Sequence, residues 1–580
     1  MKRKSYLIGH SFRYHMIASV LTMTAMNLNS IIDGILMGNL LGADAFSAIN
    51  VVMPIVNCIA AVGVLLAEGP AMRMAQSLGA MKKDKANQVF TVSMVSMLIV
   101  GLAFSGIVAA AKLAVPTVRL LCVASELTDL ALRYASVLMA GSVLLIFENG
   151  LSLLVDVMGN PRIVTIGTII KTGINILFDI LNIKVFGMDI AGAAYATLLG
   201  SLVGDAFFIL YIMKSSGMKL CACPEWLKDL GTGFAQSLPG FIGRLSSVAL
   251  MFICNYFIMA HQGSDGMFVI SIGYTLISIG SMISNGVGMS YTAIGSMLLG
   301  QEDYYGMRAL FHRGMLVVLI SPVCFSIASI FSRSLAQMFG ADTPQLLDLA
   351  QRTLPLICVM LFSLGIISSM VSLHTVLEHR IVSSVNTVFI LLSVVLAFMV
   401  TERMLPSDQI WMAFPLATVV SLLVFFADTT AISLKSKGKL QMVSLIPKQE
   451  PQGKMLDISV ECNMKEKNAA IDALIDFLRQ NEAGELEDSV IHCLDEMMMN
   501  IVNHSGRGNG SYMDLSVMIR DGKVIASLRN NGKPFDPLQL DEKERKLGLK
   551  IVFHYCTKLE YRYSFGQNIV LASWDLAVPA

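Results

Sequence analysis

The chain is poor in charged residues. Only 15% of its 580 residues are Asp, Glu, Lys or Arg, whereas 54% are hydrophobic and the mean hydropathy is +0.65. A soluble domain needs a polar exterior, so this composition excludes a single soluble domain and indicates a membrane-embedded protein.

Several motifs are missing. The sequence has no G-x-x-x-x-G-K-[ST] phosphate loop, which argues against an ATP-driven pump. The ten cysteines are scattered, and the close pair Cys221 and Cys223 has no second pair or His cluster to complete a zinc site. The basic start of the chain has no small-residue cleavage site after it, so we expect a lead-in to a spanning helix.

Charge is distributed unevenly along the chain. Residues 455–580 hold 14 Lys or Arg against 19 Asp or Glu, and the first 454 residues hold 29 against 23. The sequence therefore predicts a membrane domain over residues 1–435, a linker over 436–454 and a soluble domain over 455–580. The acidic tail lacks a basic patch with interleaved aromatics, which argues against nucleic-acid binding.

Twelve stretches are long and apolar enough to cross a bilayer as helices. A hydrocarbon core of about 30 Å requires about 20 apolar residues in a helix. The predicted spans are 14–32, 45–67, 89–111, 134–155, 162–183, 189–213, 233–260, 266–301, 314–332, 353–377, 381–401 and 409–427. Lys and Arg gather in the loops of one side, so we expect a multi-pass plasma-membrane protein with both termini in the cytosol.

The membrane domain contains an internal repeat. GADAFSAINVVMPIV from Gly42 aligns with GSDGMFVISIGYTLI from Gly263, and SLGAMKKDKANQVF from Ser77 aligns with LLGQEDYYGMRALF from Leu298. Both pairs are offset by 221 residues, which indicates a duplicated six-helix unit. We expect two six-helix lobes, at about 10–215 and 230–435, facing each other across a central cleft of low charge.

A set of motifs resembles one transporter family. The motifs are IIDGILMGNLLGADAFSAINVVMPI (31–55), MGNPR (158–162), NILFDILNI (175–183) and GAAYAT (192–197). In order and spacing they resemble the multidrug and toxic compound extrusion (MATE) family over about residues 10–435. The resemblance implies a secondary efflux transporter that exchanges H⁺ or Na⁺ for small organic substrates. It assigns the coupling site to Asp33, Asn175, Asp179 and Thr197.

Ionisable residues in these spans have a physical reason to cluster. Each costs at least about 2.5 kcal/mol in the bilayer, so such residues line cavities or pair with one another. Asn175 and Asp179 are spaced i,i+4 and share one helix face, where an amide oxygen and a carboxylate suit a cation or a proton. The alternative is that these residues only join helices through hydrogen bonds.

Two basic residues of the spans have more than one candidate role. Lys171 precedes Asn175 by one turn, so its ammonium can pair with Asp179 or Asp33 in place of sodium, or form a structural salt bridge. Arg244 can neutralise Glu148 or an anionic group in the cleft, or pack against backbone carbonyls.

The tail has the pattern of an α/β sandwich. A strand over LDISVEC is followed by two amphipathic helices, EKNAAIDALIDFLRQ and LEDSVIHCLDEMMMNIVNH. A hairpin across Asp521-Gly522, a helix at LGLKIVFHYC and a hairpin across Gly566-Gln567 complete the order β-α-α-β-β-α-β-β.

This order and its polar residues resemble the GHKL (Bergerat) ATP-binding fold of gyrase, sensor histidine kinases and anti-sigma-factor serine kinases. The resemblance makes Asn500 the Mg²⁺ ligand and Glu496 the catalytic base, with Asn503 beside them in the nucleotide pocket. An amide oxygen suits Mg²⁺, a hard ion that takes few protein oxygens.

The later GHKL signatures are eroded. Asn530 stands in place of the aspartate that reads the adenine amino group, Gly532 is retained, and Pro534 replaces the second glycine. In KLGLK, Gly548 remains to cradle phosphate, and Lys546 replaces the first glycine. Mg-ATP is the expected cofactor of the tail.

Three functions are consistent with these features. The first is an efflux transporter in the lipid bilayer with a nucleotide-binding regulatory tail. The second is a membrane-anchored serine kinase that phosphorylates an anti-sigma-antagonist-like partner. In the third, the tail keeps the fold only as a surface for docking a protein partner.

Overall fold

The computed structural model of the chain describes residues 4, 6–41, 43–80, 82–121, 125–328, 331–339, 343–448, 454–481, 486–504, 511–520, 522–539 and 547–575. The chain forms two compact units. The membrane unit comprises Met16–Gln301 and Phe311–Lys448, and the tail unit comprises Met1–His15, Glu302–Leu310 and Gln449–Ala580.

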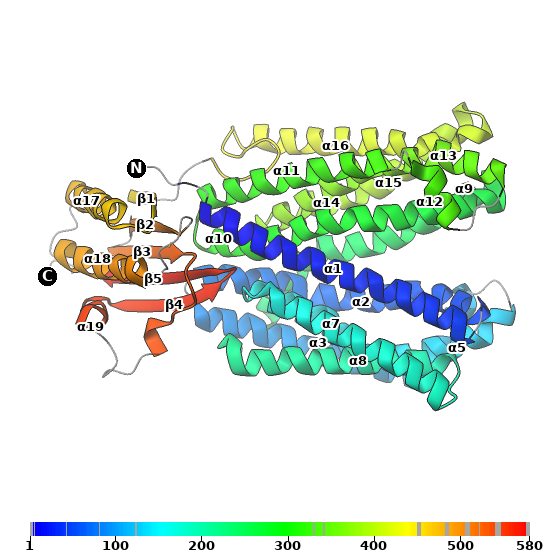
Figure 1. The fold of residues 1–580 in the computed structure, drawn as a ribbon, viewed down its shortest axis with the longest axis horizontal. Coiled ribbons are helices and arrows are strands. Elements are labelled where there is room, and N and C mark those ends of the chain that lie inside the picture. Colours follow the sequence, from blue (N-terminus) through cyan, green and yellow to red (C-terminus); the bar gives the residue numbers. More distant parts are fainter. Residues whose placement is uncertain are drawn as a thin grey trace. The chain divides into compact units, whose positions relative to one another are not determined.

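Within the described residues, the regular secondary structure of the membrane unit is helical, apart from an isolated β-bridge between Leu440 and Pro447 (Figure 1). The helices of its first half are α1 (Tyr6–Leu41), α2 (Ala43–Gly79), α3 (Lys83–Ala111), α4 (Ala114–Leu121), α5 (Ser125–Ala140), α6 (Ser142–Val157), α7 (Pro161–Ile180), η1 (Leu181–Val185), α8 (Ile190–Tyr211) and η2 (Ile212–Ser216). Those of its second half are α9 (Trp226–Ser290), η3 (Tyr291–Gly295), α10 (Ser296–Gly300), α11 (Tyr304–Ala328), α12 (Ser332–Met338), α13 (Pro344–Cys358), α14 (Met360–Val376), α15 (Arg380–Met404), η5 (Ser407–Met412) and α16 (Ala413–Lys435).

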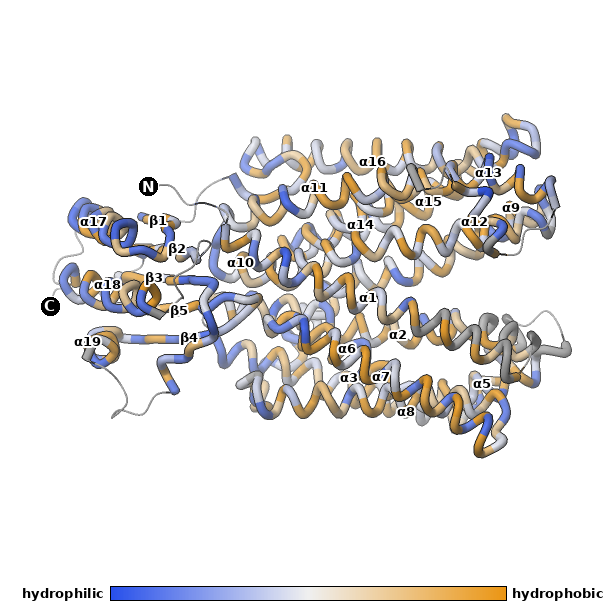
Figure 2. Tube along the Cα trace, viewed as in Figure 1, coloured by the Kyte–Doolittle hydropathy of each residue, from blue (hydrophilic) through white to orange (hydrophobic). Residues whose placement is uncertain are grey.

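Most of these helices are hydrophobic along their length (Figure 2). Among the described residues, ten helices are long and apolar enough to cross a membrane, or eleven if α5 and α6, which meet at 59°, form one bent span. α1 is not among them, and several of its side chains lie outside the described residues, so the count of twelve spans stays a prediction.

A single glycine divides the longest helix. Gly263 interrupts α9 with φ 59° and ψ −148°, a backbone conformation that residues with a Cβ rarely adopt. The two parts of α9 correspond to the predicted spans at 233–260 and 266–301. The second part continues through a π-helical turn, η3, into α10.

The two halves meet through a pair of glycines at the ends of α2 and α10. A Cβ on Gly79 would lie 2.3 Å from the carbonyl oxygen of Met297, and a Cβ on Gly300 would lie 2.0 Å from that of Gln76. The 221-residue offset relates Gly79 to Gly300 and Gln76 to Met297. The same backbone contact is therefore made twice, once from each copy of the repeat, and glycine is required because any side chain would collide with main chain.

The tail unit contains a five-stranded antiparallel sheet in the order β1-β2-β3-β5-β4. Its elements are β1 (Lys454–Glu461), α17 (Met464–Gln480), α18 (Leu486–His504), β2 (Tyr512–Arg520), β3 (Lys523–Asn530), η6 (Pro537–Gln539), α19 (Leu547–Tyr555), β4 (Lys558–Ser564) and β5 (Gln567–Asp575). Apart from the short η6, this is the predicted order. The apolar faces of α17 and α18 and the inward side chains of the sheet form one core, which includes Leu474, Leu494, Leu515 and Trp574.

The two hairpins differ in how well the sequence predicts them. β2 and β3 pair Arg520 with Lys523, so the turn is at 521–522 as expected, and Gly522 has φ 70°. β4 and β5 pair Ser564 with Gln567, so the second turn is Phe565-Gly566 and the prediction of Gly566-Gln567 is wrong by one residue. Phe565 adopts φ 52° and is fully buried, so burial of its ring offsets the cost of a left-handed backbone.

Candidate functional site

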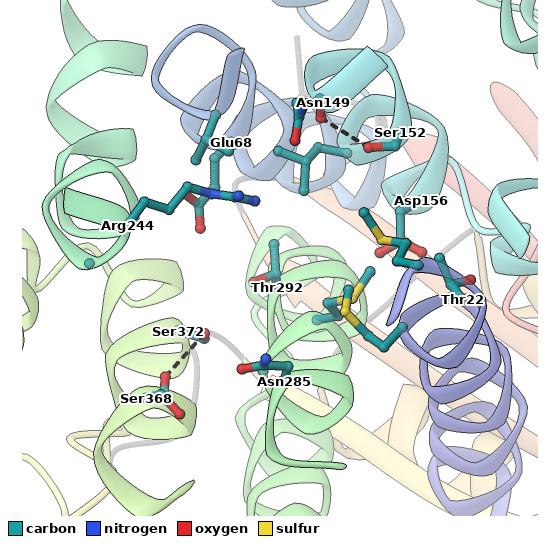
Figure 3. Close-up of a pocket in the computed structure, with 18 of the residues that line it drawn as sticks. Thr22, Glu68, Asn149, Ser152, Asp156, Arg244, Asn285, Thr292, Ser368 and Ser372 are labelled. Carbon is teal, nitrogen blue, oxygen red and sulfur yellow. Dashed lines mark hydrogen bonds between the residues drawn. The ribbon is translucent and has the colours of Figure 1, made fainter. Parts of the chain in front are cut away.

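A cavity of about 750 Å³ lies within the membrane unit. Its lining comes from α1, α2, α6, α7 and α8 of the first half and from α9, η3, α14 and α15 of the second. Figure 3 shows Asn149 and Ser152 of α6 across the cavity from Ser368 and Ser372 of α14. Thr292 of the π-helical turn η3 also lines it, and such turns are frequent at functional sites. The cavity occupies the place of the predicted cleft between the halves.

The lining carries several ionisable side chains. They are Glu68, Glu148, Asp156, Lys171 and Arg244. The expectation of a cleft of low charge is therefore wrong. The expectation was wrong because the spans were predicted from charge-free runs. The predicted span 45–67 therefore stops just before Glu68, whereas α2 continues to Gly79.

Lys171 and Glu148 form an ion pair on the cavity wall. Lys171 of α7 donates from Nζ to Oε1 of Glu148 on α6. The hydroxyl of Ser201 on α8 donates a 2.6 Å hydrogen bond to Oε2 of the same carboxylate. Lys171 therefore pairs with Glu148, and the predicted pairing of Lys171 with Asp179 is wrong. Because Lys171 is the partner of Glu148, the predicted pairing of Arg244 with Glu148 is also wrong.

The path of the lysine side chain explains this pairing. Gly204 on α8 faces Lys171, and a Cβ there would lie 3.3 Å from Cβ of Lys171. The absent side chain leaves space between α7 and α8 for the lysine. Asp205, next along α8, is buried, and neither of its carboxylate oxygens accepts a hydrogen bond from another described residue. Asp205 lies within electrostatic reach of both Glu148 and Lys171.

The predicted coupling residues of α7 lie together but outside this lining. Asn175 and Asp179 are 2% and 1% exposed, and Nδ2 of Asn175 donates a 3.2 Å hydrogen bond to Oδ2 of Asp179. Thr197 on α8 donates to the carbonyl oxygen of Ala193 in its own helix. The side chain of Asp33, in α1, lies outside the described residues.

Glu68 and Arg244 face the cavity from different halves. Glu68 is on α2 and Arg244 is on α9, and Figure 3 shows the arginine side chain extending toward Glu68. The sequence analysis missed Glu68. The signal that could have found it is the continuation of the apolar pattern beyond the acid, which marks a polar group inside a helix rather than at its end.

The membrane unit matches one family of known proteins twice. The MatE family model aligns with residues 18–181 and 239–401. Together these segments make up more than half of the chain, and they begin 221 residues apart. The chain belongs to the MatE family. It is therefore a multi-pass membrane transporter, and each half of its membrane unit corresponds to one copy of the family's repeat.

Known relatives of this MatE chain are transporters from staphylococci. Multidrug export protein MepA of Staphylococcus haemolyticus is 24% identical over 342 residues, which are 57% of this chain and 74% of the relative. MepA of Staphylococcus aureus is 27% identical over 278 residues, 46% of this chain and 60% of the relative. The chain thus spans less than two thirds of the length of the second relative.

Solved structures share the fold of this MatE chain. An outward-facing MATE family transporter of the MOP superfamily superposes with a TM-score of 0.67 at 19% identity, covering 75% of this chain and all of that one. A MOP superfamily transporter from Pyrococcus furiosus, described as having a binding pocket of reverse polarity, gives a TM-score of 0.67 at 20% identity over 75% of this chain and 99% of that one. At these identities the likeness shows the fold alone.

In the tail unit, the predicted adenine-reading residue belongs to an internal network. Oδ1 of Asn530 accepts hydrogen bonds from the backbone N–H of Gly532 at 2.9 Å and from Nδ2 of Asn568 at 3.1 Å. The Tyr561 hydroxyl donates a 2.6 Å hydrogen bond to Oδ1 of Asn568. Burial raises the pKa of Tyr561 to about 12, so the phenol stays protonated as a donor. The oxygen assigned to the adenine amino group thus already accepts two hydrogen bonds.

The predicted catalytic and phosphate-binding residues do meet. A Cβ on Gly548, in the first turn of α19, would lie 2.0 Å from Oε2 of Glu496 on α18. The glycine therefore lets the carboxylate reach the N-terminal end of α19, where backbone N–H groups favour an anion. Asn500 is half-buried and Asn503 is exposed on the same helix, and Lys546 lies outside the described residues.

Two ion pairs join the sheet of the tail unit to the segment Glu302–Leu310. Arg529 of β3 donates to Oδ2 of Asp303 at 2.9 Å, and the two side chains are 4% and 3% exposed. NH1 of Arg520 donates to both carboxylate oxygens of Glu302 at 2.9 Å. The first copy of the repeat has Met81 and Lys82 at the positions of these acids, so the acids are particular to the second copy.

The first turns of α1 contact the β4–β5 hairpin in the same unit. The hydroxyl of Ser11 donates a 2.8 Å hydrogen bond to the carbonyl oxygen of Phe565, and Nε2 of Gln567 donates to that of Leu7 at 2.6 Å. The rings of Tyr6 and Tyr512 stack with centroids 4.3 Å apart. The left-handed turn at Phe565-Gly566 thus forms a docking point for α1.

Proposed function

We propose that the chain is a secondary active efflux transporter that exchanges H⁺ or Na⁺ for small organic substrates, with the cavity between its halves as the substrate site. The observation that carries the proposal is a cavity lined by both copies of the MatE repeat and bordered by buried acids. The multidrug export proteins among its relatives support organic substrates.

Buried acids beside the cavity supply the ion-exchange chemistry. A buried carboxylate without a hydrogen-bond donor is costly, so binding of a proton or a cation lowers that cost. Asp205 is such a group among the described residues. Asp179 is a second buried acid, and the neutral amide of Asn175, which donates to its Oδ2, would share with it the binding of a proton or a cation. Binding and release of that ion would change the electrostatic energy of the helices around the cavity.

The first test replaces one acid in purified protein reconstituted into liposomes. Asp179→Asn removes the ionisable group but keeps its size. Gradient-driven uptake or export of a fluorescent organic cation is expected to fall at least about tenfold, because the loss of one charge-assisted interaction has about that effect. The matched control is Asp189→Asn, because Asp189 is an exposed acid that caps α8 and pairs with Arg133. Full transport by the Asp179→Asn protein would refute the assignment. Proton and sodium gradients are imposed separately to identify the coupling ion.

For the tail we propose a regulatory module that binds Mg-ATP. Asn500 would hold the Mg²⁺ and the N-terminal end of α19 at Gly548 would receive phosphate, with Glu496 placed to act as the base on an attacking hydroxyl. The approach of Glu496 to Gly548 supports this arrangement. Phosphate transfer to an anti-sigma-antagonist-like protein is the activity that a competent base would give.

A second function of the tail is favoured by the network around Asn568. Because Nδ2 of Asn568 donates to Oδ1 of Asn530 and to the carbonyl oxygen of Lys533, this loop is held within the protein without an adenine ring. The tail can then act as a nucleotide-free docking surface for a protein partner.

Titration of the full-length protein with Mg-ATP decides between these functions. The regulatory module predicts saturable binding of Mg-ATP in calorimetry. Asn500→Ala is expected to lower the affinity about tenfold or more, because a metal ligand is lost. His492→Ala, at an exposed position of the same helix, controls for loss of helix stability. Absence of any saturable binding would exclude the ATP-binding module and its kinase activity and would favour the docking function.

A further inference from the structure

Among the described charged side chains that line the cavity, Glu68 and Arg244 form no ion pair with each other or with a neighbour. Within the described residues, Oε2 of Glu68 is buried without a hydrogen-bond partner, and Arg244 forms no ion pair within 4.0 Å. Electrostatic interaction between the two is nevertheless present, with the guanidinium acting on the Glu68 carboxylate. The two opposite charges therefore lie near each other on the cavity wall without an ion pair within 4.0 Å.

The other charges of the lining differ in this respect. Glu148 is held by Lys171 and by the hydroxyl of Ser201. Asp156 has partners of its own within the protein. Among the described lining residues, Glu68 of α2 and Arg244 of α9 are then the charged groups left without such a pair.

The pair discriminates among ligands by charge. A purely cationic ligand at Glu68 would be repelled by Arg244, and a purely anionic ligand at Arg244 would be repelled by Glu68. A molecule that carries both charges satisfies both groups at once. The planar guanidinium fork matches a carboxylate in two parallel hydrogen bonds, and an ammonium can donate to the Glu68 carboxylate.

We propose that Glu68 and Arg244 form a two-pole binding site for zwitterionic organic substrates, with the cationic group at Glu68 and the carboxylate at Arg244. This inference rests on the proposed function of the cavity as a substrate site. Since the two poles belong to different halves of the membrane unit, a zwitterion bound to both joins the halves during the transport cycle.

A glycine positions the acidic pole. A Cβ on Gly240 of α9 would lie 1.8 Å from Oε2 of Glu68 and 2.7 Å from its carboxyl carbon. The Glu68 carboxylate therefore lies against a notch in α9, about one turn from Arg244. Gly240→Ala would displace the carboxylate without changing any charge.

The chain provides a matched control for this substitution. Gly243 lies three residues further along α9 and also lines the cavity, yet a Cβ there would meet only Cγ2 of Thr387 at 3.5 Å, an ordinary contact. Gly243→Ala thus adds the same methyl group to the same helix and leaves Glu68 in place.

The test measures binding of two dyes to purified full-length protein in detergent by fluorescence anisotropy. One is a rhodamine with a free carboxylate, and the other is the methyl ester of the same dye, which is only cationic. The proposal predicts that the wild-type protein binds the carboxylate dye about tenfold more tightly than the ester, as one charge-assisted interaction provides. Arg244→Gln removes this preference, and Arg244→Lys, which keeps the charge without the fork, retains part of it.

The glycine variants test the acidic pole. Gly240→Ala is expected to weaken binding of both dyes about tenfold, and Gly243→Ala is expected to bind both like the wild type. Equal or tighter binding of the ester by the wild type, or an unchanged preference in Arg244→Gln, overturns the proposal. If the wild-type protein prefers the carboxylate dye but shows no ion-driven transport, the two-pole site is supported and the proposed exchange is rejected. Failure of the binding site and failure of the exchange are therefore distinguishable.

Discussion

At the scale of single residues, buried charges follow the space that neighbouring helices leave for them. The sequence left open whether Lys171 pairs with Asp179 or Asp33 or forms a structural salt bridge, because residues one turn apart share a helix face. Lys171 pairs with Glu148 on α6, since Gly204 opens a path between α7 and α8. The sequence identifies which residues are ionisable and buried, but the rotation of each helix about its axis decides the partners.

The same limit applies in the tail. The sequence places Asn530 and Gly532 in the correct loop, directly after β3. It contains no signal that Asn568, 38 residues later, supplies the donor that fills the Asn530 oxygen. Cross-strand neighbours become visible only when the register of β3 and β5 is known.

The Arg529–Asp303 pair gives a prediction at this scale. Arg529→Met removes one member of a buried ion pair, so the cost is expected to be about 3–5 kcal/mol. Lys523→Met is the control, because Lys523 begins the same strand and its pair with Asp575 is half exposed, worth about 0–1 kcal/mol. The measurement is hydrogen exchange of the β3 amides in the full-length protein. Equal loss of protection in the two variants would show that the buried pair does not stabilise the sheet.

At the scale of elements, the sequence was most informative where periodicity is strong. The order of helices and strands in the tail followed from alternating and helical patterns, and the break in α9 at Gly263 lies between two predicted spans. Boundaries were less accurate: α2 extends past Glu68, and the β4–β5 turn is Phe565-Gly566. A buried phenylalanine with positive φ contradicts the local preference, and only its packing explains it.

The contact between α2 and α10 gives a prediction at this scale. Gly300→Ala would place a methyl group 2.0 Å from the carbonyl oxygen of Gln76, and such overpacking costs about 1–3 kcal/mol. Gly173→Ala is the control, because no atom lies within 4 Å of a Cβ there and alanine favours a helix by about 1 kcal/mol. The Tm of the purified protein is expected to fall for Gly300→Ala and to stay level or rise for Gly173→Ala. A Gly300→Ala protein as stable as the control would contradict the close backbone contact.

At the scale of the whole molecule, the duplicated unit organises the transporter. The 221-residue offset visible in the sequence recurs in the two family matches and in the reciprocal glycine contacts. The two copies differ in sequence at the positions that contact the rest of the tail unit. Acids at Glu302 and Asp303 pair with the tail, whereas the first copy has Met81 and Lys82 at those positions.

The most direct test of exchange reverses the usual direction of coupling. Purified protein in liposomes, with no ion gradient imposed, receives a saturating organic substrate on one side, and a dye for H⁺ or Na⁺ reports the ion on the other side. Exchange predicts that the substrate gradient alone drives one of these ions in the opposite direction, and that Asp179→Asn abolishes the signal. Substrate movement without any counter-movement of H⁺ or Na⁺ would contradict the account.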